Sequence, residues 1–298
     1  MSRPCKIGIQ LPEVERFVPW PEYIDMARQA EAAGFDSIWV GDHLLYDLPD
    51  GSTRGPYEAW TALAAVAQAT ERVEIGPLVA STSFHAPAML AKQAATVDAI
   101  SGGRLILGLG AGWNKREYDA YGFAHDRRVS RFEEALAIIV ALLREGRTTF
   151  KGEFYEVADC VLDPRPVRDG GPPIMLGSTG PRMLSIGLPV VDSWNVWWNR
   201  YDNSVERFAE VKAEVDAVMP SGRYVEATAA VLVTLSDGEG RLMGERYGAR
   251  LTRVTPDDLA DHVRGLAAAG ASHLQLVLDP ITARSIAIVG EVLADLDR

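Results

Sequence analysis

Short apolar runs alternate with amphipathic segments along most of the chain, and this alternation constrains the fold more than any other feature of the sequence. The runs are rich in β-branched residues, and the longer segments repeat apolar residues at helical spacing. This pattern is typical of βα units around a parallel sheet. We count eight such units. Several runs are apolar almost throughout, as strands covered on both faces must be.

The predicted strands are Lys6–Leu11, Ser37–Val40, Val73–Val79, Arg104–Leu109, Pro173–Gly177, Ser193–Trp197, Thr228–Leu235 and His273–Leu278. The predicted helices are Tyr23–Ala33, Ala59–Ala69, Ala88–Ile100, Arg131–Arg144, Val205–Val218, Leu259–Ala269 and Ala283–Leu296. An open doubly wound sheet is the alternative arrangement. We favour a closed barrel, because no GxGxxG motif opens the first βα turn. The expected fold is therefore an α/β (β/α)8 TIM barrel, with residues 1–298 as one domain.

One stretch, roughly residues 114–172, is too long for a single crossover between the fourth and fifth strands. It contains a predicted helix and then Thr148–Val157, which reads as a hairpin turning at Lys151-Gly152. Insertions after barrel strands usually shape the pocket. A hairpin that only covers the edge of the barrel is an equal alternative.

The net charge of −11 and the pI near 5.0 exclude binding along a nucleic-acid backbone, which needs a concentrated basic surface. No stretch reaches the roughly 18 uninterrupted apolar residues of a membrane span, and the first residues resemble no signal peptide. We therefore expect a cytoplasmic protein. Cys5 and Cys160 stand far apart and the histidines form no HxxxH or HxH pair, so we expect neither a disulfide nor a metal site.

The ends of the predicted strands carry the residues that suit chemistry, since barrel active sites form at the carboxyl ends of strands. Asp42 and His43 directly follow the second strand. An imidazole titrates near neutral pH, so His43 can donate or accept a proton. The alternative is that Asp42 caps a helix and His43 is merely exposed.

Glycine and proline interrupt the third strand at Gly76-Pro77, which indicates a bulge against a ligand or a bulge needed only for closure. The fourth strand ends at Gly108, Gly110 and Gly112, where missing side chains would let a flat ring or a phosphate chain approach the backbone. GxGxG alone is a weak indication.

Hydroxyls, glycines and a cation follow the fifth strand in Gly177-Ser178-Thr179-Gly180-Pro181-Arg182. This combination suits a phosphate at a helix start, although a plain turn with capping hydroxyls explains it too. The sixth strand leads into Trp197-Trp198-Asn199, in a chain with 7 tryptophans. Aromatic and amide side chains at a barrel mouth suggest a wall of the substrate site.

Two longer stretches, Ala30–His43 and Ala91–Trp113, resemble the luciferase-like monooxygenase superfamily, and especially its branch that uses the deazaflavin coenzyme F420. The resemblance covers nearly the whole chain. It implies a TIM barrel with an insertion after the fourth strand and a coenzyme ring at the mouth. It also implies a non-proline cis peptide in the third strand, which falls on Pro77-Leu78 with a register margin of one residue.

The resemblance assigns site residues by position. Asp42 and His43 match an acid and imidazole pair beside the ring, which gives the catalytic residues. Gly177, Ser178, Thr179, Gly180 and Arg182 match the family's phosphate loop, and Pro77 and Leu78 its bulge against the ring. With the strand-end residues Gly110, Ala111, Gly112 and Trp113 these complete the expected coenzyme contacts, while Trp197, Trp198 and Asn199 are the expected substrate contacts from the aromatic and amide pattern given above. Some related dehydrogenases carry a glutamate proton donor where this chain has Trp113. That difference leaves the general acid unassigned, with His43 as the best remaining candidate.

The resulting hypothesis is an F420-dependent oxidoreductase that transfers a hydride between the coenzyme and a small organic substrate. The first alternative is an FMN-dependent monooxygenase supplied with reduced flavin by a separate reductase. The second is a flavin-binding protein without turnover. Lys115, Arg116, Arg54 and Arg200 are candidates to meet the acidic tail of F420, or are solvated surface charges. Members of the resembled family are often dimers, so a homodimer is one possible assembly, and the sequence leaves the oligomeric state open.

Overall fold

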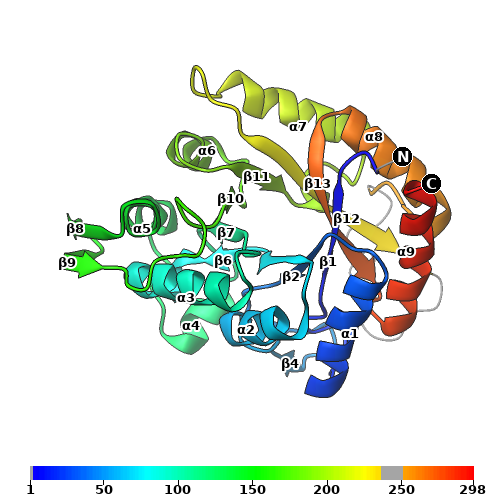
Figure 1. Ribbon diagram of the computed structural model, residues 1–298, viewed down its shortest axis with the longest axis horizontal. Coiled ribbons are helices and arrows are strands. Elements are labelled where there is room, and N and C mark those ends of the chain that lie inside the picture. Colours follow the sequence, from blue (N-terminus) through cyan, green and yellow to red (C-terminus); the bar gives the residue numbers. More distant parts are fainter. Residues whose placement is uncertain (1–2, 236–250) are drawn as a thin grey trace.

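A computed structural model describes residues 3–235 and 251–298 of the chain. Its main sheet is parallel, and the strands follow the order β5-β2-β1-β13-β12-β11-β10-β7-β6. The strands surround a core, and the helices pack on their outer side (Figure 1). The strands are β1 (Lys6–Gln10), β2 (Ser37–Val40), β5 (Glu74–Pro77), β6 (Ala80–Ser81), β7 (Leu107–Gly110), β10 (Ile174–Leu176), β11 (Ser193–Val196), β12 (Glu226–Thr234) and β13 (Ala271–Asp279).

The third barrel strand is split into β5 and β6 by a cis peptide between Leu78 and Val79. β5 pairs with β2 and β6 pairs with β7, so the two pieces together occupy one position in the barrel. A bridge between Ile75 and Leu105 joins the base of β5 to the chain that leads into β7. This closes the ring of eight positions, as the eight βα units predict. The cis bond lies one residue after the expected Pro77-Leu78 bond.

The helices with predicted bounds begin and end close to them, and α2 and α9 match them, while no bounds were predicted for α4 and α6. The helices are α1 (Trp20–Ala32), α2 (Ala59–Ala69), α3 (Pro87–Ile100), α4 (Lys115–Tyr121), α5 (Arg128–Glu145), α6 (Pro181–Gly187), α7 (Val205–Ala217), α8 (Pro256–Ala268) and α9 (Ala283–Leu296). Helix α5 begins three residues earlier than predicted, and this first turn reaches the site described below. Within the described chain, no helix has the length and apolar character that a membrane span requires.

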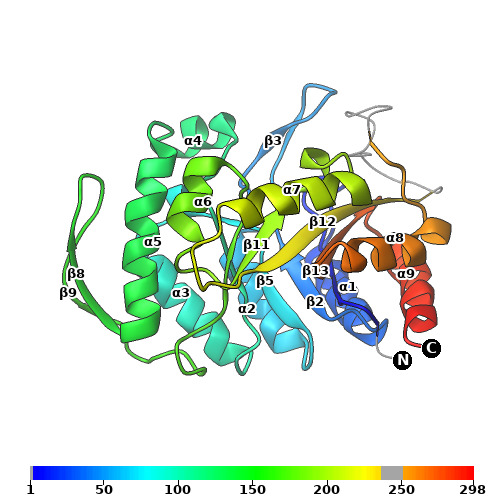
Figure 2. The same ribbon diagram turned by 90° about the horizontal axis from the view of Figure 1, so that it is seen from above.

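The segment between β7 and β10 divides into parts with different positions. Helix α4 lies next to the barrel mouth, and α5 packs beside α3 as the crossover helix of the fourth unit. The hairpin formed by β8 (Arg147–Lys151) and β9 (Glu156–Val161) projects outward beyond α5 (Figures 1 and 2). The hairpin was predicted correctly. It is the helical part of the insertion, rather than the hairpin, that borders the mouth.

Polar side chains as well as apolar ones fill the barrel interior below the mouth. The His273 ring accepts a hydrogen bond from the Ser37 hydroxyl, 2.7 Å away, while Ser37 accepts one from the Trp39 indole. Burial, with a smaller contribution from the positive charge of Lys6, lowers the pKa of His273 to about 3. His273 is therefore neutral in the folded protein, which is consistent with its acceptor role.

Candidate active site

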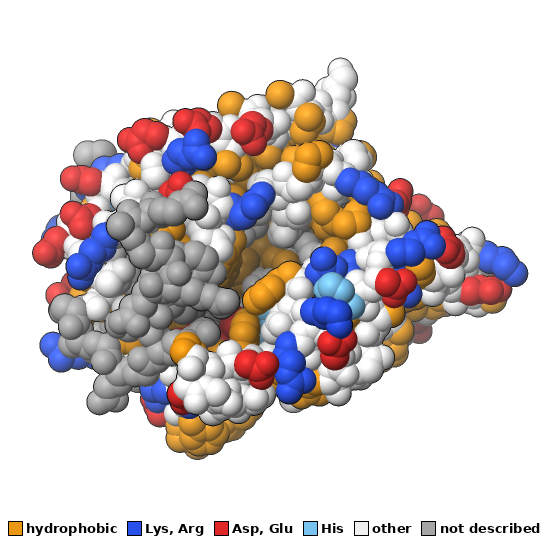
Figure 3. All heavy atoms as spheres, turned by 180° about the vertical axis from the view of Figure 1, so that it is seen from behind, with side chains coloured by type: hydrophobic (Ala, Val, Ile, Leu, Met, Phe, Trp, Pro, Cys, Tyr) orange, Lys and Arg blue, Asp and Glu red, His pale blue; other side chains and the backbone are white. Residues whose placement is uncertain are grey.

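A cavity of about 1310 Å³ opens at the carboxyl ends of the strands. A hollow with hydrophobic side chains inside and charged side chains of both signs around it is visible in the surface view (Figure 3). Twelve of the fourteen residues expected to contact coenzyme or substrate line this cavity. They are Leu78, Gly110–Trp113, Gly177–Gly180 and Trp197–Asn199. Asp42 and His43 line it as well. The strand ends that the sequence singled out therefore meet in one place.

Two expected coenzyme residues, Pro77 and Arg182, lie outside the lining. Pro77 precedes the bulge, and its carbonyl faces the backbone at Gly108. The guanidinium of Arg182 turns away from the mouth and donates to Ser130 and Glu133 on α5, at 2.9 and 3.1 Å. The site proposed below does not include these two residues.

The glycines at the ends of β7 and β10 leave room for the side chain of Val79. A Cβ atom on Gly110 would lie 2.8 Å from Val79 Cγ2, and one on Gly177 would lie 2.5 Å from the same atom. Such distances are too short for carbon atoms in contact. The space on the Cβ side of these glycines is thus taken by Val79, and all three residues line the cavity. Glycine is required here because the bulge after β5 turns inward.

The buried Asp42 carboxylate connects the ends of β2 and β6. Its Oδ2 atom accepts hydrogen bonds from the Ser81 backbone N–H at 2.8 Å and from His85 Nε2 at 2.9 Å. Asp42 is 4% exposed and caps no helix. The alternative of a helix-capping Asp42 beside an exposed His43 is therefore wrong.

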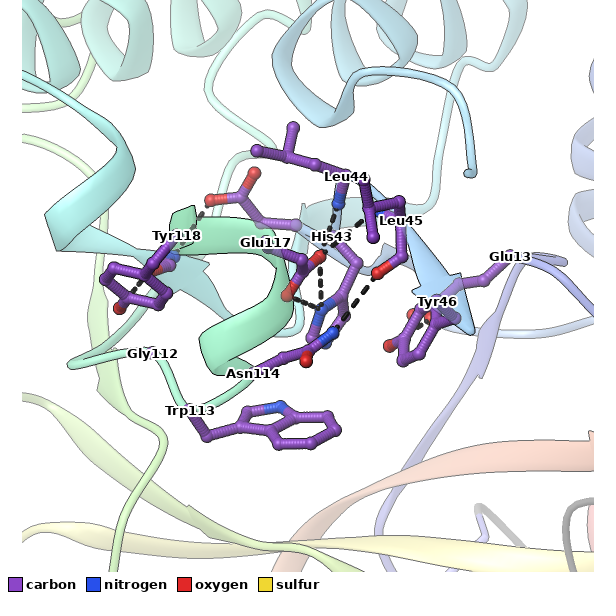
Figure 4. A network of polar contacts seen from close by, with 12 residues as sticks. Glu13, His43, Leu44, Leu45, Tyr46, Gly112, Trp113, Asn114, Glu117 and Tyr118 are labelled. Carbon is purple, nitrogen blue, oxygen red and sulfur yellow. Dashed lines mark hydrogen bonds and ion pairs between the residues drawn. The ribbon is translucent and has the colours of Figure 1, made fainter. Parts of the chain in front are cut away.

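The His43 ring is held from behind by a glutamate that the sequence reasoning missed. Nδ1 of His43 lies 3.1 Å from both carboxylate oxygens of Glu117, which is fully buried (Figure 4). The same carboxylate accepts the backbone N–H groups of Leu44 at 2.5 Å and Leu45 at 3.3 Å. The Tyr46 ring, tilted to the imidazole, and the Trp113 ring, edge-on to it, flank His43 at centroid distances of 4.7 and 5.6 Å.

Burial lowers the pKa of His43, but the hydrogen bond to Glu117 and the charges of Glu13, Glu117 and Asp42 raise it more. The net result is a pKa above the ordinary value of 6.5. His43 is only 18% exposed, so these charges act with little solvent screening. At neutral pH a larger fraction of His43 is therefore protonated than of a free imidazole.

A second polar group stands across the mouth, after the end of β1. Glu13 accepts hydrogen bonds from Gln10 Nε2 at 2.6 Å and from the Tyr46 hydroxyl at 2.9 Å, and all three residues line the cavity. Burial and then the negative charge of Glu13 raise the pKa of Tyr46. Tyr46 is therefore a neutral hydrogen-bond donor at physiological pH.

Glu13 and Glu117, which the sequence did not single out, both follow the end of a barrel strand. Glu13 stands two residues beyond the predicted first strand, and Glu117 stands one helical turn beyond Trp113. Both positions follow barrel strands, where side chains reach the mouth. A survey of every strand end, including the first, would have found Glu13. The contact between Glu117 and His43, by contrast, depends on how α4 packs.

The cations expected at the mouth are placed differently from one another. Lys115 pairs with Asp119 at 2.6 Å and Arg116 with Asp47 at 3.3 Å, while Arg54 donates to the carbonyl of Val14. These three do not line the cavity, but Arg200 does.

Arg128, from the first turn of α5, is a further lining cation. It donates to the carbonyls of Gly112 and Trp113 at 3.0 and 3.2 Å. In the described chain, no group of histidine, cysteine and acidic residues is arranged to hold a metal ion.

Comparison with known proteins connects this site to one family. The family model for luciferase-like monooxygenases matches residues 7–273. The F420-dependent glucose-6-phosphate dehydrogenase of Amycolatopsis mediterranei is 33% identical over 180 residues, covering 59% of this chain and 52% of that protein. The FMNH2-dependent dimethylsulfone monooxygenase of Pseudomonas putida is 28% identical over 234 residues, covering 73% of this chain and 61% of that protein. The matched region thus spans about half the length of the first relative.

A solved structure of an F420-dependent secondary alcohol dehydrogenase, in complex with an F420–acetone adduct, superimposes with a TM-score of 0.75. The two chains are 20% identical and each is covered completely, so this likeness supports the fold. The fold class inferred from the βα alternation is confirmed. Because the family model covers most of the sequence, the chain belongs to the luciferase-like monooxygenase family.

Proposed function

We propose that this protein is a deazaflavin-dependent oxidoreductase that transfers a hydride between coenzyme F420 and a small organic substrate. The observation that carries the proposal is the placement of His43, the Leu78–Val79 bulge and the Gly177–Gly180 turn around one cavity. The similarity to an F420-dependent glucose-6-phosphate dehydrogenase supports the choice of coenzyme.

The residues around the cavity fit a tricyclic ring with a phosphate-bearing tail. Drug-sized ligand sites measure roughly 300–1,000 Å³, so this cavity can hold a ring and a substrate together. The bulge supplies an apolar surface through Leu78 and Val79. Ser178 and Thr179 offer hydroxyls for a phosphate, and Arg128 and Arg200 offer positive charge among the lining residues.

When bound, the coenzyme would supply the two-electron chemistry, and the protein would bind, orient and exclude water. Leu78 and Val79 would support one side of the ring. Trp197, Trp198 and Asn199 would form the substrate wall, which favours a substrate that is small and largely apolar. His43 would exchange the proton that accompanies hydride transfer. Asp42 would act by holding the ends of β2 and β6 together, through Ser81 and His85.

A second candidate function is FMN-dependent oxygenation with a separate reductase. The similarity to an FMNH2-dependent monooxygenase over 73% of this chain favours it. The tails of the two coenzymes differ, because F420 carries acidic groups beyond its phosphate and FMN ends at its phosphate. Whether Arg128 and Arg200 bind the coenzyme tail therefore distinguishes F420 from FMN as the coenzyme. A third candidate, a flavin-binding protein without turnover, differs from both in catalysis.

The test is a pair of parallel titrations of the protein with oxidised F420 and oxidised FMN, followed by difference absorption spectroscopy. We expect a saturable spectral change with F420 at micromolar concentration and a weaker one with FMN. Reduction of bound F420 by a panel of small secondary alcohols would then exclude a role in binding alone. Tight binding of FMN without binding of F420 would contradict the proposal and favour the monooxygenase.

A further inference from the structure

We propose that Glu117 is a positioning residue that keeps the proton of neutral His43 on Nδ1, so that His43 exchanges protons with the substrate at Nε2. The inference deepens the proposed function and rests on it for the identity of the reaction. Hydride transfer to or from a carbon that bears a hydroxyl leaves one proton to be exchanged at that oxygen. The ring nitrogen of His43 that is free of a proton is the one that can accept this proton.

The geometry around Glu117 determines which atoms donate. A carboxylate accepts hydrogen bonds and cannot donate them. Both oxygens lie 3.1 Å from His43 Nδ1, so Nδ1 must carry a proton. Nε2 is on the other side of the ring, and His43 lines the cavity. Between described residues, every hydrogen bond to the ring is made at Nδ1.

The charged and titratable groups around His43 favour the same arrangement. Glu117 approaches from α4, Asp42 precedes His43 on the β2 end, and Glu13 and Tyr46 lie on the far side of the ring (Figure 4). The three acids all favour a protonated imidazole. His43 would therefore alternate between an imidazolium and a neutral ring with its proton on Nδ1. Both changes take place at Nε2, the ring nitrogen to which no described residue hydrogen-bonds.

A structural role for Glu117 can be separated from a role in positioning the proton. Glu117 Oε1 accepts the N–H groups of Leu44 and Leu45, and Asn114 independently donates to the Leu45 carbonyl at 3.1 Å. In Glu117→Gln the amide oxygen can still accept both N–H groups. The amide NH2 at the Oε2 position would then face Nδ1 as a donor and disfavour a proton there, while the amide oxygen at the Oε1 position, 3.1 Å from Nδ1, already accepts two N–H groups. This substitution preserves the hydrogen bonds to Leu44 and Leu45 and moves the proton of neutral His43 to Nε2.

The experiment uses the full chain labelled with 15N-histidine, without coenzyme, and NMR spectra across a pH series. His43→Gln assigns the resonances. We expect neutral His43 to carry its proton on Nδ1 in the wild type and on Nε2 in Glu117→Gln, with a lower pKa in the variant. Asp119→Asn is the matched control, because Asp119 lies on the same helix, is exposed and pairs with Lys115. It should leave both the tautomer and the pKa unchanged.

A folded Glu117→Gln protein with the wild-type tautomer and titration would overturn the inference. So would a wild-type His43 whose neutral form is protonated on Nε2, a result that needs no variant to fold. With F420 bound, Glu117→Gln should lower kcat about tenfold or more, while the coenzyme Kd changes less than about twofold. Absence of F420 binding would contradict the proposed function instead, and it would leave the tautomer measurement valid.

Discussion

The Cγ2 atom of Val79 lies 2.5 Å from the position that a Cβ atom would take on Gly177. The bulge of the third barrel strand and the turn after the fifth are thus in direct contact across the mouth. In the proposed function, this contact would hold the apolar support for the coenzyme ring at a fixed distance from the Ser178 and Thr179 hydroxyls. Gly110 of β7 packs against the same Val79 side chain, because a Cβ atom on Gly110 would lie 2.8 Å from Val79 Cγ2.

Gly177→Ala should therefore displace Val79 and weaken coenzyme binding. Forced overpacking of this kind typically costs about 1–3 kcal/mol of folding free energy. Gly180→Ala is a matched stability control from the same turn, because its Cβ would meet Ser178 Oγ at an ordinary 3.6 Å. Urea unfolding of both variants measures the difference. Equal stability of the two would contradict the assigned role of Gly177.

His43→Ala should lower the turnover number while leaving coenzyme affinity nearly intact. General acid–base groups contribute roughly 10²–10⁴-fold to rates, and we expect a loss in this range. Steady-state kinetics with the best alcohol of the panel gives kcat, and the absorption titration gives Kd. Unchanged turnover would remove His43 from the mechanism.

Arg200→Gln should weaken F420 binding about threefold and leave FMN binding nearly unchanged, since an exposed cation contributes modestly and only the F420 tail carries acidic groups beyond the phosphate. Added salt should reduce the difference. Arg264→Gln is the control, because Arg264 is exposed on α8 and pairs with Asp261. An equal loss of affinity for both coenzymes would indicate that Arg200 contacts a part that they share.

The unfolding free energy should fall as the pH decreases from about 6.5 to about 3, partly because of His273. Its pKa is about 3 in the folded protein and near 6.5 in an unfolded chain, so the unfolded state binds the extra proton in this window. The contribution of His273 to the free energy of unfolding therefore rises with pH over this interval and reaches its full value above it. Urea unfolding at several pH values measures the slope. The slope should be smaller in His273→Asn, and an equal slope would show that His273 titrates normally.

The distribution of apolar residues was sufficient to predict the order of the elements. Helices 59–69 and 283–296 and strand 37–40 have the predicted bounds, because each has a strong local pattern and clear end residues. Boundaries differed where tertiary contacts decide them. The third strand was predicted as one run from Val73 to Val79, but it divides at Leu78–Val79.

By itself, the sequence determined the βα order, the closed barrel and the strand ends that form the mouth, because these follow from local periodicity and from the geometry of parallel barrels. Only the tertiary structure decided the partners of those residues. It turned Arg182 toward Glu133, filled the space beside Gly110 and Gly177 with Val79, and placed Glu117 behind His43. The physical reason is that contacts between side chains on separate units depend on helix packing and strand register, which leave no local pattern in the chain.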